Sequence, residues 1–275
     1  MTGIGRVFRE QKEKGNGALI GYVMGGDPEP EYTLSIADAL VKGGVDVLEL
    51  GIPFSDPIAD GPTIQAANTR ALKAGTTPKI VMEMAKEIKK KRGVPVVLLT
   101  YYNPVFRMGL DNFFSLSQDC KVDGIVVPDL PVEESNAYKQ AALKRGVDTI
   151  FLAAPSTSTE RLRKIVACTS GFLYLVSHFG VTGEKQRVAE ATLQLISRVL
   201  PYTRGHVPLA VGFGISKPEH ARRIIEAGAD GAIVGSAFVN IVQKSQDNVI
   251  RMFSEIEETA RKLKKATEKA APAQG

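Results

Sequence analysis

Two carboxylates in the stretch Val45–Ile64 (VDVLELGIPFSDPIADGPTI) have the residue type and the placement of an acid/base pair. Glu49 lies inside an apolar run with the character of a buried strand, where a carboxylate costs free energy unless it is hydrogen-bonded or protonated. Asp60 lies in the loop that Gly51 opens. A glutamate near the end of a strand and an aspartate in the adjoining loop can together give and take protons. The alternative for both is a structural role, as a helix cap or a loop aspartate.

The elements that would position this pair are apolar runs of strand length, which alternate with charged segments of helical periodicity. Eight strands are predicted, at Ala18–Met24, Val45–Leu50, Pro95–Tyr101, Gly124–Val127, Thr149–Ala153, Phe172–Val176, Leu209–Phe213 and Gly231–Val234. Helices are predicted between them, at Glu31–Gly43, Pro78–Arg92, Glu133–Arg145, Thr159–Cys168, Val188–Leu200 and Pro218–Ala227. This alternation predicts parallel strands that are covered on both faces. Closing eight such units gives a single (β/α)8 TIM barrel, and an open doubly wound sheet is the alternative.

The length and composition of the chain fit one barrel. The chain has 275 residues, of which 44% are hydrophobic and 24% charged, and ~250 residues are typical of a (β/α)8 barrel. We assign residues 1–265 to the barrel, with an extra helix at the N-terminus and short helical insertions such as Asp111–Leu116. The sequence from Lys262 onward is polar and is predicted to fray, and residues 266–275 are predicted to be a disordered tail.

The remaining features of the composition bear on the class of protein. Cys120 and Cys168 form no metal or redox motif and are expected to be reduced. His178 is the one histidine at a predicted strand end, and no second ligand lies at a metal-binding spacing, so no metal site is expected. No run is apolar enough to span a membrane and no signal peptide is evident, which predicts a cytoplasmic location. The net charge of +5 is spread over the helices and indicates a solvated surface.

A barrel places its chemistry in the loops that follow its strands. Gly214 follows the seventh predicted strand, and Gly235 and Ser236 follow the eighth, where the segment Ala237–Gln243 begins a helix. Glycines let the backbone approach an anion, and N–H groups at a helix start point toward it. These two loops are therefore predicted to bind a phosphate group, although tight turns alone would also need glycine. Ser216–Glu219 is predicted to form a capping box.

Aromatic residues occur at or near four of the strand ends. Tyr22, Tyr102, Tyr174 and Phe213 could together wall a flat aromatic pocket, and core packing is the alternative. Asp129 lies between two prolines of a loop and is assigned a structural role. The glycines of the sixth loop, Gly180–Gly183, are predicted to let that loop close over the phosphate as a lid.

The stretch LELGIPFSDPIADGPTIQ (Leu48–Gln65) resembles the signature of the tryptophan synthase alpha subunit family. Shorter matches follow in order along nearly the whole chain: GGDP at Gly25–Pro28, YYNPVF at Tyr101–Phe106, GVTG at Gly180–Gly183, GFGIS at Gly212–Ser216 and GSAFV at Gly235–Val239. The resemblance implies a (β/α)8 barrel that cleaves indole-3-glycerol phosphate to indole and glyceraldehyde 3-phosphate without a cofactor of its own. It also implies a pyridoxal-phosphate-dependent beta subunit as partner, in an alpha2-beta2 heterotetramer with allosteric coupling.

The resemblance assigns roles to individual residues. Glu49 would be the general acid/base at C3 of the indole and at the neighbouring hydroxyl, and Asp60 would hydrogen-bond the indole N–H. Tyr174 would position the substrate. The remaining positions are phosphate contacts at Gly183, Gly214, Gly235 and Ser236, and walls of the indole pocket at Tyr22, Tyr102 and Phe213. His178 and Phe179 depart from the family pattern, which bears on packing of the lid and its coupling to the partner.

Other functions remain open at this stage. A stand-alone lyase would share the chemistry and release indole rapidly without a partner. A subunit kept mainly to activate its partner need not retain both Glu49 and Asp60. A sugar-phosphate epimerase would need metal-ligand histidines, and an isomerase would not require the Asp60 loop.

Overall fold

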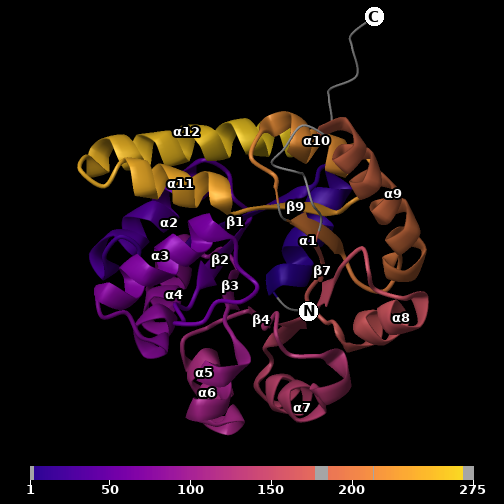
Figure 1. The fold of residues 1–275 in the computed structure, drawn as a ribbon, viewed down its shortest axis with the longest axis horizontal. Helices are drawn as coiled ribbons and strands as arrows, with labels where there is room; N and C mark the ends of the chain where they lie inside the picture. Colours follow the sequence, from indigo (N-terminus) through magenta and orange to yellow (C-terminus); the bar gives the residue numbers. More distant parts are fainter. Residues whose placement is uncertain (1–2, 177–184, 213, 269–275) are drawn as a thin grey trace, which may run out of the picture.

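The structure is a computed structural model that describes residues 3–176, 185–212 and 214–268. Its parallel strands are β1 (Ala18–Met24), β2 (Val47–Gly51), β3 (Val96–Leu99), β4 (Gly124–Val126), β5 (Asp148–Ile150), β6 (Leu152–Ala153), β7 (Leu173–Val176), β8 (Leu209–Gly212) and β9 (Gly231–Val234). They pair in the order β5-β4-β3-β2-β1-β9-β8-β7-β6. Figure 1 shows the helices surrounding this sheet.

The sheet is the predicted eight-stranded barrel. β5 and β6, the two ends of the pairing order, are halves of one predicted strand and are separated only by Phe151. The ladder therefore starts and finishes on the same stretch of chain, which confirms the closed barrel over the open sheet. Neighbouring strands pair in parallel throughout, and β1 sets Tyr22 beside Glu49 of β2.

The helices largely follow the predicted segments. They are α1 (Gly3–Glu13), α2 (Thr33–Lys42), α3 (Pro62–Lys73), α4 (Pro78–Arg92), α5 (Tyr102–Met108), α6 (Leu110–Asp119), α7 (Asn136–Arg145), α8 (Thr159–Cys168), α9 (Lys185–Thr203), α10 (Pro218–Glu226), α11 (Ser236–Lys244) and α12 (Val249–Thr267), with 3-10 turns η1 (Pro30–Tyr32) and η2 (Val132–Glu134). The extra N-terminal helix is present as α1, and α5 and α6 are the short insertions. α3 was not among the predicted helices.

The prediction that the chain frays from Lys262 is wrong for the described part of that segment. α12 continues to Thr267, and Leu263, Ala266 and Thr267 are buried on its inner face. Lys264 is held as well, because its Nζ lies 2.7 Å from an oxygen of Asp46. An apolar stripe at helical spacing therefore runs through a segment whose other residues are polar. Residues 269–275 of the predicted tail lie outside the described residues.

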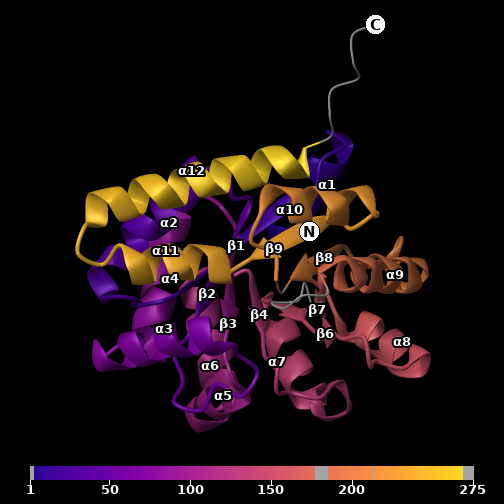
Figure 2. The ribbon, with the colours of Figure 1, turned by 45° about the horizontal axis from the view of Figure 1, so that its top comes forward.

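The two largest parts of the core lie inside the barrel and between the strands and the surrounding helices, and a smaller cluster surrounds Tyr22. Side chains alternate along each strand, so Leu48 and Leu50 of β2 face the helices while Val47 faces the barrel interior. α1 supplies Ile4 and Phe8 to the interior. Figure 1 shows this helix inside the ring of outer helices, and Figure 2 shows it beside the end of α12. α1 therefore fills the end of the barrel at which the strands begin.

We expect Phe8→Ala to destabilise the protein by ~3–5 kcal/mol, the usual cost of removing a buried phenylalanine. Phe8 is buried against Phe172, with ring centroids 5.7 Å apart. The measurement is urea-induced unfolding of the variant and of wild type. Phe106→Ala is the matched control, because that ring is 68% exposed and exposed positions change stability by only about 0.5 kcal/mol. Equal losses for both variants would contradict a barrel closed by α1.

Candidate active site

Glu49 lies at the end of β2 with its side chain turned into the barrel. Its alternation with Val47, which belongs to the interior cluster, fixes this direction. The residue is 0% exposed. Neither of its carboxylate oxygens has a hydrogen-bond partner among the described residues. Burial, and secondarily the charge of Asp60, raises the pKa of Glu49 to about 8.

Asp60 has the opposite environment, because two side chains donate hydrogen bonds to its carboxylate. The Tyr101 hydroxyl donates to it, and Asn68 Nδ2 lies 3.2 Å from its Oδ2. Burial still raises the pKa of Asp60, and these hydrogen bonds oppose that rise. Asp60 is therefore the more readily ionised of the two carboxyl groups, and its charge in turn favours the neutral form of Glu49.

The loop that carries Asp60 is fastened at several points to α3 and to the end of β3. Asn68 Oδ1 accepts a hydrogen bond from Phe54 N at 2.9 Å, and the Tyr101 hydroxyl accepts one from Ala59 N at 2.9 Å. The rings of Phe54 and Tyr101 stack with centroids 5.3 Å apart. Because these contacts fix the backbone on both sides of the loop, the position of the Asp60 carboxylate is set before any ligand arrives.

Asn68 and Tyr101 were not predicted as site residues. Asn68 lies on α3, which was not recognised as a helix, although a buried asparagine at 2% exposure marks a required hydrogen bond. Tyr101 belongs to the quoted YYNPVF block, where only its neighbour Tyr102 received a role. Tyr101 is the last residue of the predicted strand, and choosing the tyrosine nearer the strand would have identified it.

Tyr22 and Tyr174 are buried at the same end of the barrel as the two carboxyl groups. The pKa of the Tyr174 hydroxyl is raised by burial and then by the charges of Glu49 and Asp60. Its ring occupies space left by Gly212, where a Cβ atom would come 2.7 Å from the tyrosine oxygen. The structure thus brings together four of the predicted residues, Glu49, Asp60, Tyr22 and Tyr174.

Tyr102 lies apart from this group in its described contacts. It begins α5, where its N–H donates to Asp129 Oδ1 at 2.8 Å, and its ring is 6.2 Å from that of Phe106. Asp129 therefore has the structural role predicted for it. The assignment of Tyr102 to an indole pocket stays a prediction. Phe213 and Gly183 lie outside the described residues.

The two loops predicted to bind phosphate have the expected backbone features. Gly235 is the N-cap of α11 and Ser236 its first residue. Gly214 has a positive φ of 76°, a conformation that favours glycine. The predicted capping box is wrong: Pro218 begins α10, Lys217 is its N-cap, and the Lys217 side chain forms no capping hydrogen bond. Ser216 therefore lies one residue too early to serve as the cap.

The chain matches the family model described as tryptophan synthase alpha chain over residues 8–268. It is 47% identical to the tryptophan synthase alpha chain of Methanoregula boonei, over 96% of this chain and 99% of that protein. The alpha chain of Methanopyrus kandleri is 49% identical, over 94% and 91%. The chain belongs to the tryptophan synthase alpha chain family.

Solved structures agree with membership in the tryptophan synthase alpha chain family. The tryptophan synthase alpha subunit of Legionella pneumophila superposes with a TM-score of 0.84 at 34% identity, covering 96% of this chain and 98% of that one. A chain of tryptophan synthase from Mycobacterium tuberculosis gives 0.83 at 32% identity, covering 95% and 98%. The family predicted from the stretch Leu48–Gln65 is confirmed, and with it a role in tryptophan biosynthesis.

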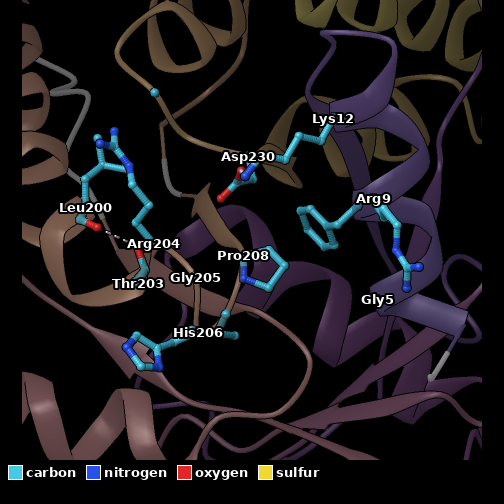
Figure 3. A pocket seen from close by; sticks show the side chains of 13 residues that line it. Gly5, Arg9, Lys12, Leu200, Thr203, Arg204, Gly205, His206, Pro208 and Asp230 are labelled. Atoms are coloured by element: carbon cyan, nitrogen blue, oxygen red, sulfur yellow. Dashed lines mark hydrogen bonds and ion pairs between the residues drawn. The ribbon is translucent and has the colours of Figure 1, made fainter.

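A separate pocket of about 450 Å³ lies at the opposite end of the alpha-chain barrel (Figure 3). It is lined by α1 and by the loops that precede β8 and β9. Lys12 and Asp230 form an ion pair of 3.9 Å within it, while Arg9 and Arg204 extend from opposite walls and point away from each other. The basic side chains do not converge, and the pocket is remote from Glu49.

The described residues of this alpha chain contain neither a group of metal ligands nor a membrane-spanning helix. Among residues 3–176, 185–212 and 214–268, no three histidine, cysteine, aspartate or glutamate side chains are grouped as metal ligands. Within the same ranges, no helix is both long and apolar enough to cross a membrane. Cys120 and Cys168 are free thiols, as predicted.

We expect Glu49→Gln to change how the stability of the protein depends on pH. The folded state keeps the Glu49 proton up to about pH 8, whereas the unfolded chain releases it near the ordinary pKa of 4.5. The stability contributed by the neutral carboxyl is therefore complete below pH 4.5 and is lost as the pH rises to about 8. The loss is up to ~1.4 kcal/mol per pH unit.

The measurement is the free energy of unfolding of wild type and Glu49→Gln at several pH values between these limits. Other titrating groups are common to both proteins, so their difference isolates Glu49. The variant should gain stability relative to wild type as the pH rises. Parallel curves would show that Glu49 titrates normally.

Proposed function

We propose that this chain cleaves indole-3-glycerol phosphate to indole and glyceraldehyde 3-phosphate by a retro-aldol reaction. The observation that carries the proposal is the pair of carboxyl groups in unlike environments. Glu49 is buried with no hydrogen bond from the described residues and has a raised pKa, while Asp60 is held by Tyr101 and Asn68. This difference in environment assigns the role of general acid to Glu49 and the role of stabilising positive charge to Asp60.

The first step places a proton on C3 of the indole ring. Glu49 is neutral near pH 7 because its pKa lies at about 8, so its carboxyl can give that proton. The ring then carries a positive charge that is shared with the nitrogen. Asp60 accepts a hydrogen bond from the indole N–H and stabilises this charge. Its fixed position means that little reorganisation is needed when the charge develops.

The second step breaks the bond between C3 and the side chain. Glu49, now a carboxylate, removes the proton of the hydroxyl next to C3, and the C–O bond becomes the carbonyl of the aldehyde. The electrons of the broken bond return to the ring and cancel its charge. Glu49 thereby regains its proton, and the free acid is restored for the next turnover. Each proton transfer of this kind contributes roughly 10²–10⁴-fold to the rate.

The remaining parts of the substrate would be held by the loops around the pair. Gly214, Gly235 and Ser236 would bind the phosphate, supported by the glycine turn after β8 and by the helix that begins after β9. Tyr174 would position the substrate beside Glu49. Gly183 and Phe213 complete the proposed phosphate and indole contacts.

A beta subunit that uses pyridoxal phosphate is the proposed partner, in an alpha2-beta2 heterotetramer in the cytoplasm. It would take the indole and join it to serine. The proposal draws on membership in the family and on the Mycobacterium tuberculosis tryptophan synthase structure. A stand-alone lyase and a mainly partner-activating subunit are the alternatives, and turnover with and without the partner separates all three.

We expect Glu49→Gln and Asp60→Asn each to lower the rate of indole release by at least about 10²-fold, because each removes a group that acts on a proton or a developing charge. The measurement is indole formation from indole-3-glycerol phosphate by the isolated chain. Asp56→Asn is the control, since this exposed aspartate in the same loop contacts Ser55 rather than Asp60. Near-normal turnover in the Glu49 variant would refute the mechanism.

We also expect slow indole release by the isolated chain and a sharp increase when a tryptophan synthase beta subunit is added. The assay is run with wild type, with and without the partner. Fast release without the partner would identify a stand-alone lyase. No release by this chain under either condition, with activation of the beta subunit alone, would identify a partner-activating subunit.

A further inference from the structure

Tyr22 is the register partner of Glu49 on the neighbouring strand. Its hydroxyl lies against Gly51, which follows Glu49 by two residues and therefore lies on the same face of β2. Any side chain at position 51 would occupy the place of this hydroxyl. The hydroxyl oxygen is thus held next to Glu49, on the side nearer the end of the barrel at which the strands finish.

The ring of Tyr22 is fixed on several sides. It packs with Ala67 and Ala71 of α3 and with Val239 of α11. A Cβ atom at Gly235 would come 3.1 Å from the ring, so this glycine also makes room for Tyr22. Because helices and glycines confine the ring, the hydroxyl has one direction available to it.

The hydroxyl of Tyr22 is buried and has no hydrogen-bond partner among the described residues. The same is true of both oxygens of Glu49. A buried polar atom without a partner is costly, and such atoms in native proteins call for an explanation. Burial and the charges of Asp60 and Glu49 raise the pKa of the Tyr22 hydroxyl, so it remains a donor throughout the neutral range. Three polar atoms that the described residues leave without partners thus gather at one end of the barrel.

We infer that the Tyr22 hydroxyl donates a hydrogen bond to a hydroxyl oxygen of the substrate side chain, and so selects substrates that carry this hydroxyl. The inference rests on the proposed lyase function and deepens it. The only hydrogen-bonding group of the indole ring is its N–H, which donates to Asp60. The side chain of the substrate instead carries oxygen acceptors, and these would face Glu49 and Gly51. A site built around a buried donor rejects an analogue that leaves the donor unpaired.

Tyr22→Phe separates this role from that of a pocket wall, because phenylalanine keeps the ring and loses only the hydroxyl. Two ligands are compared. For indole-3-glycerol phosphate the measured quantity is kcat/KM. For indole-3-propyl phosphate, which lacks the side-chain hydroxyls, it is the inhibition constant. We expect kcat/KM to fall about ten-fold, as for loss of one buried hydrogen bond. The inhibition constant of the propyl compound should stay within about two-fold or improve, since it offers the hydroxyl no partner.

Thermal unfolding of the free protein is the structural readout. Tyr22→Phe should leave the Tm unchanged or raise it, because none of the described residues forms a hydrogen bond with the hydroxyl. Tyr138→Phe is the matched control: its buried hydroxyl donates to Ile125 O at 3.3 Å, so its removal should lower the Tm and leave kcat/KM unchanged. An unchanged kcat/KM in Tyr22→Phe, equal weakening of both ligands, or a lowered Tm would each overturn the inference.

The proposed function and this inference fail in different ways. Wild-type protein that neither cleaves indole-3-glycerol phosphate nor binds the propyl compound overturns the proposed function. Wild-type protein that does both, while Tyr22→Phe matches it for both ligands, overturns only the role of the Tyr22 hydroxyl.

Discussion

The candidate active site depends on one carboxyl group, Glu49, buried inside a barrel of apolar strands. β1 and β3 flank the strand that carries Glu49 and shield the group from water, and none of the described residues gives it a hydrogen bond. The charge of Asp60 further disfavours its ionisation. A carboxyl group in this environment is protonated near neutral pH. Its pKa of about 8 is still close enough to neutral for the group to give up its proton during a reaction. Catalysis that must first give and then take a proton needs a group of this kind.

The second carboxyl group is controlled by different means. Asp60 belongs to a loop, and loops hold side chains accurately only when other elements fasten them. α3 does so through Asn68, and the end of β3 does so through Tyr101. The strand thus sets the pKa of one carboxyl group and the helix sets the position of the other. The two environments remain linked, because the charge of Asp60 also raises the pKa of Glu49.

The barrel could be predicted because buried parallel strands are apolar on both faces and therefore stand out along the chain. α3 could not be, since its buried face consists mainly of the small residues Ala67 and Ala71, with Asn68 beside them. The part of the site that depends on α3 was missed for the same reason. The two adjacent tyrosines at the end of β3 look alike in sequence, and only the folded chain shows that Tyr101 contacts Asp60. Glu49 was recognisable because a carboxylate interrupts an apolar strand.

Hydrogen bonds join the C-terminal half of α1, and the turn that follows it, to the last turns of α12. Gly17 N donates to Thr267 O at 2.8 Å, and Lys264 Nζ lies 3.0 Å from Gln11 Oε1. Both contacts lie where the strands begin, across the barrel from Glu49. The first and last helices of the described chain therefore hold each other in place, although they are separated by the whole barrel in sequence. Local unfolding of α12 would thus release α1 as well, and the two helices are expected to open as one cooperative unit.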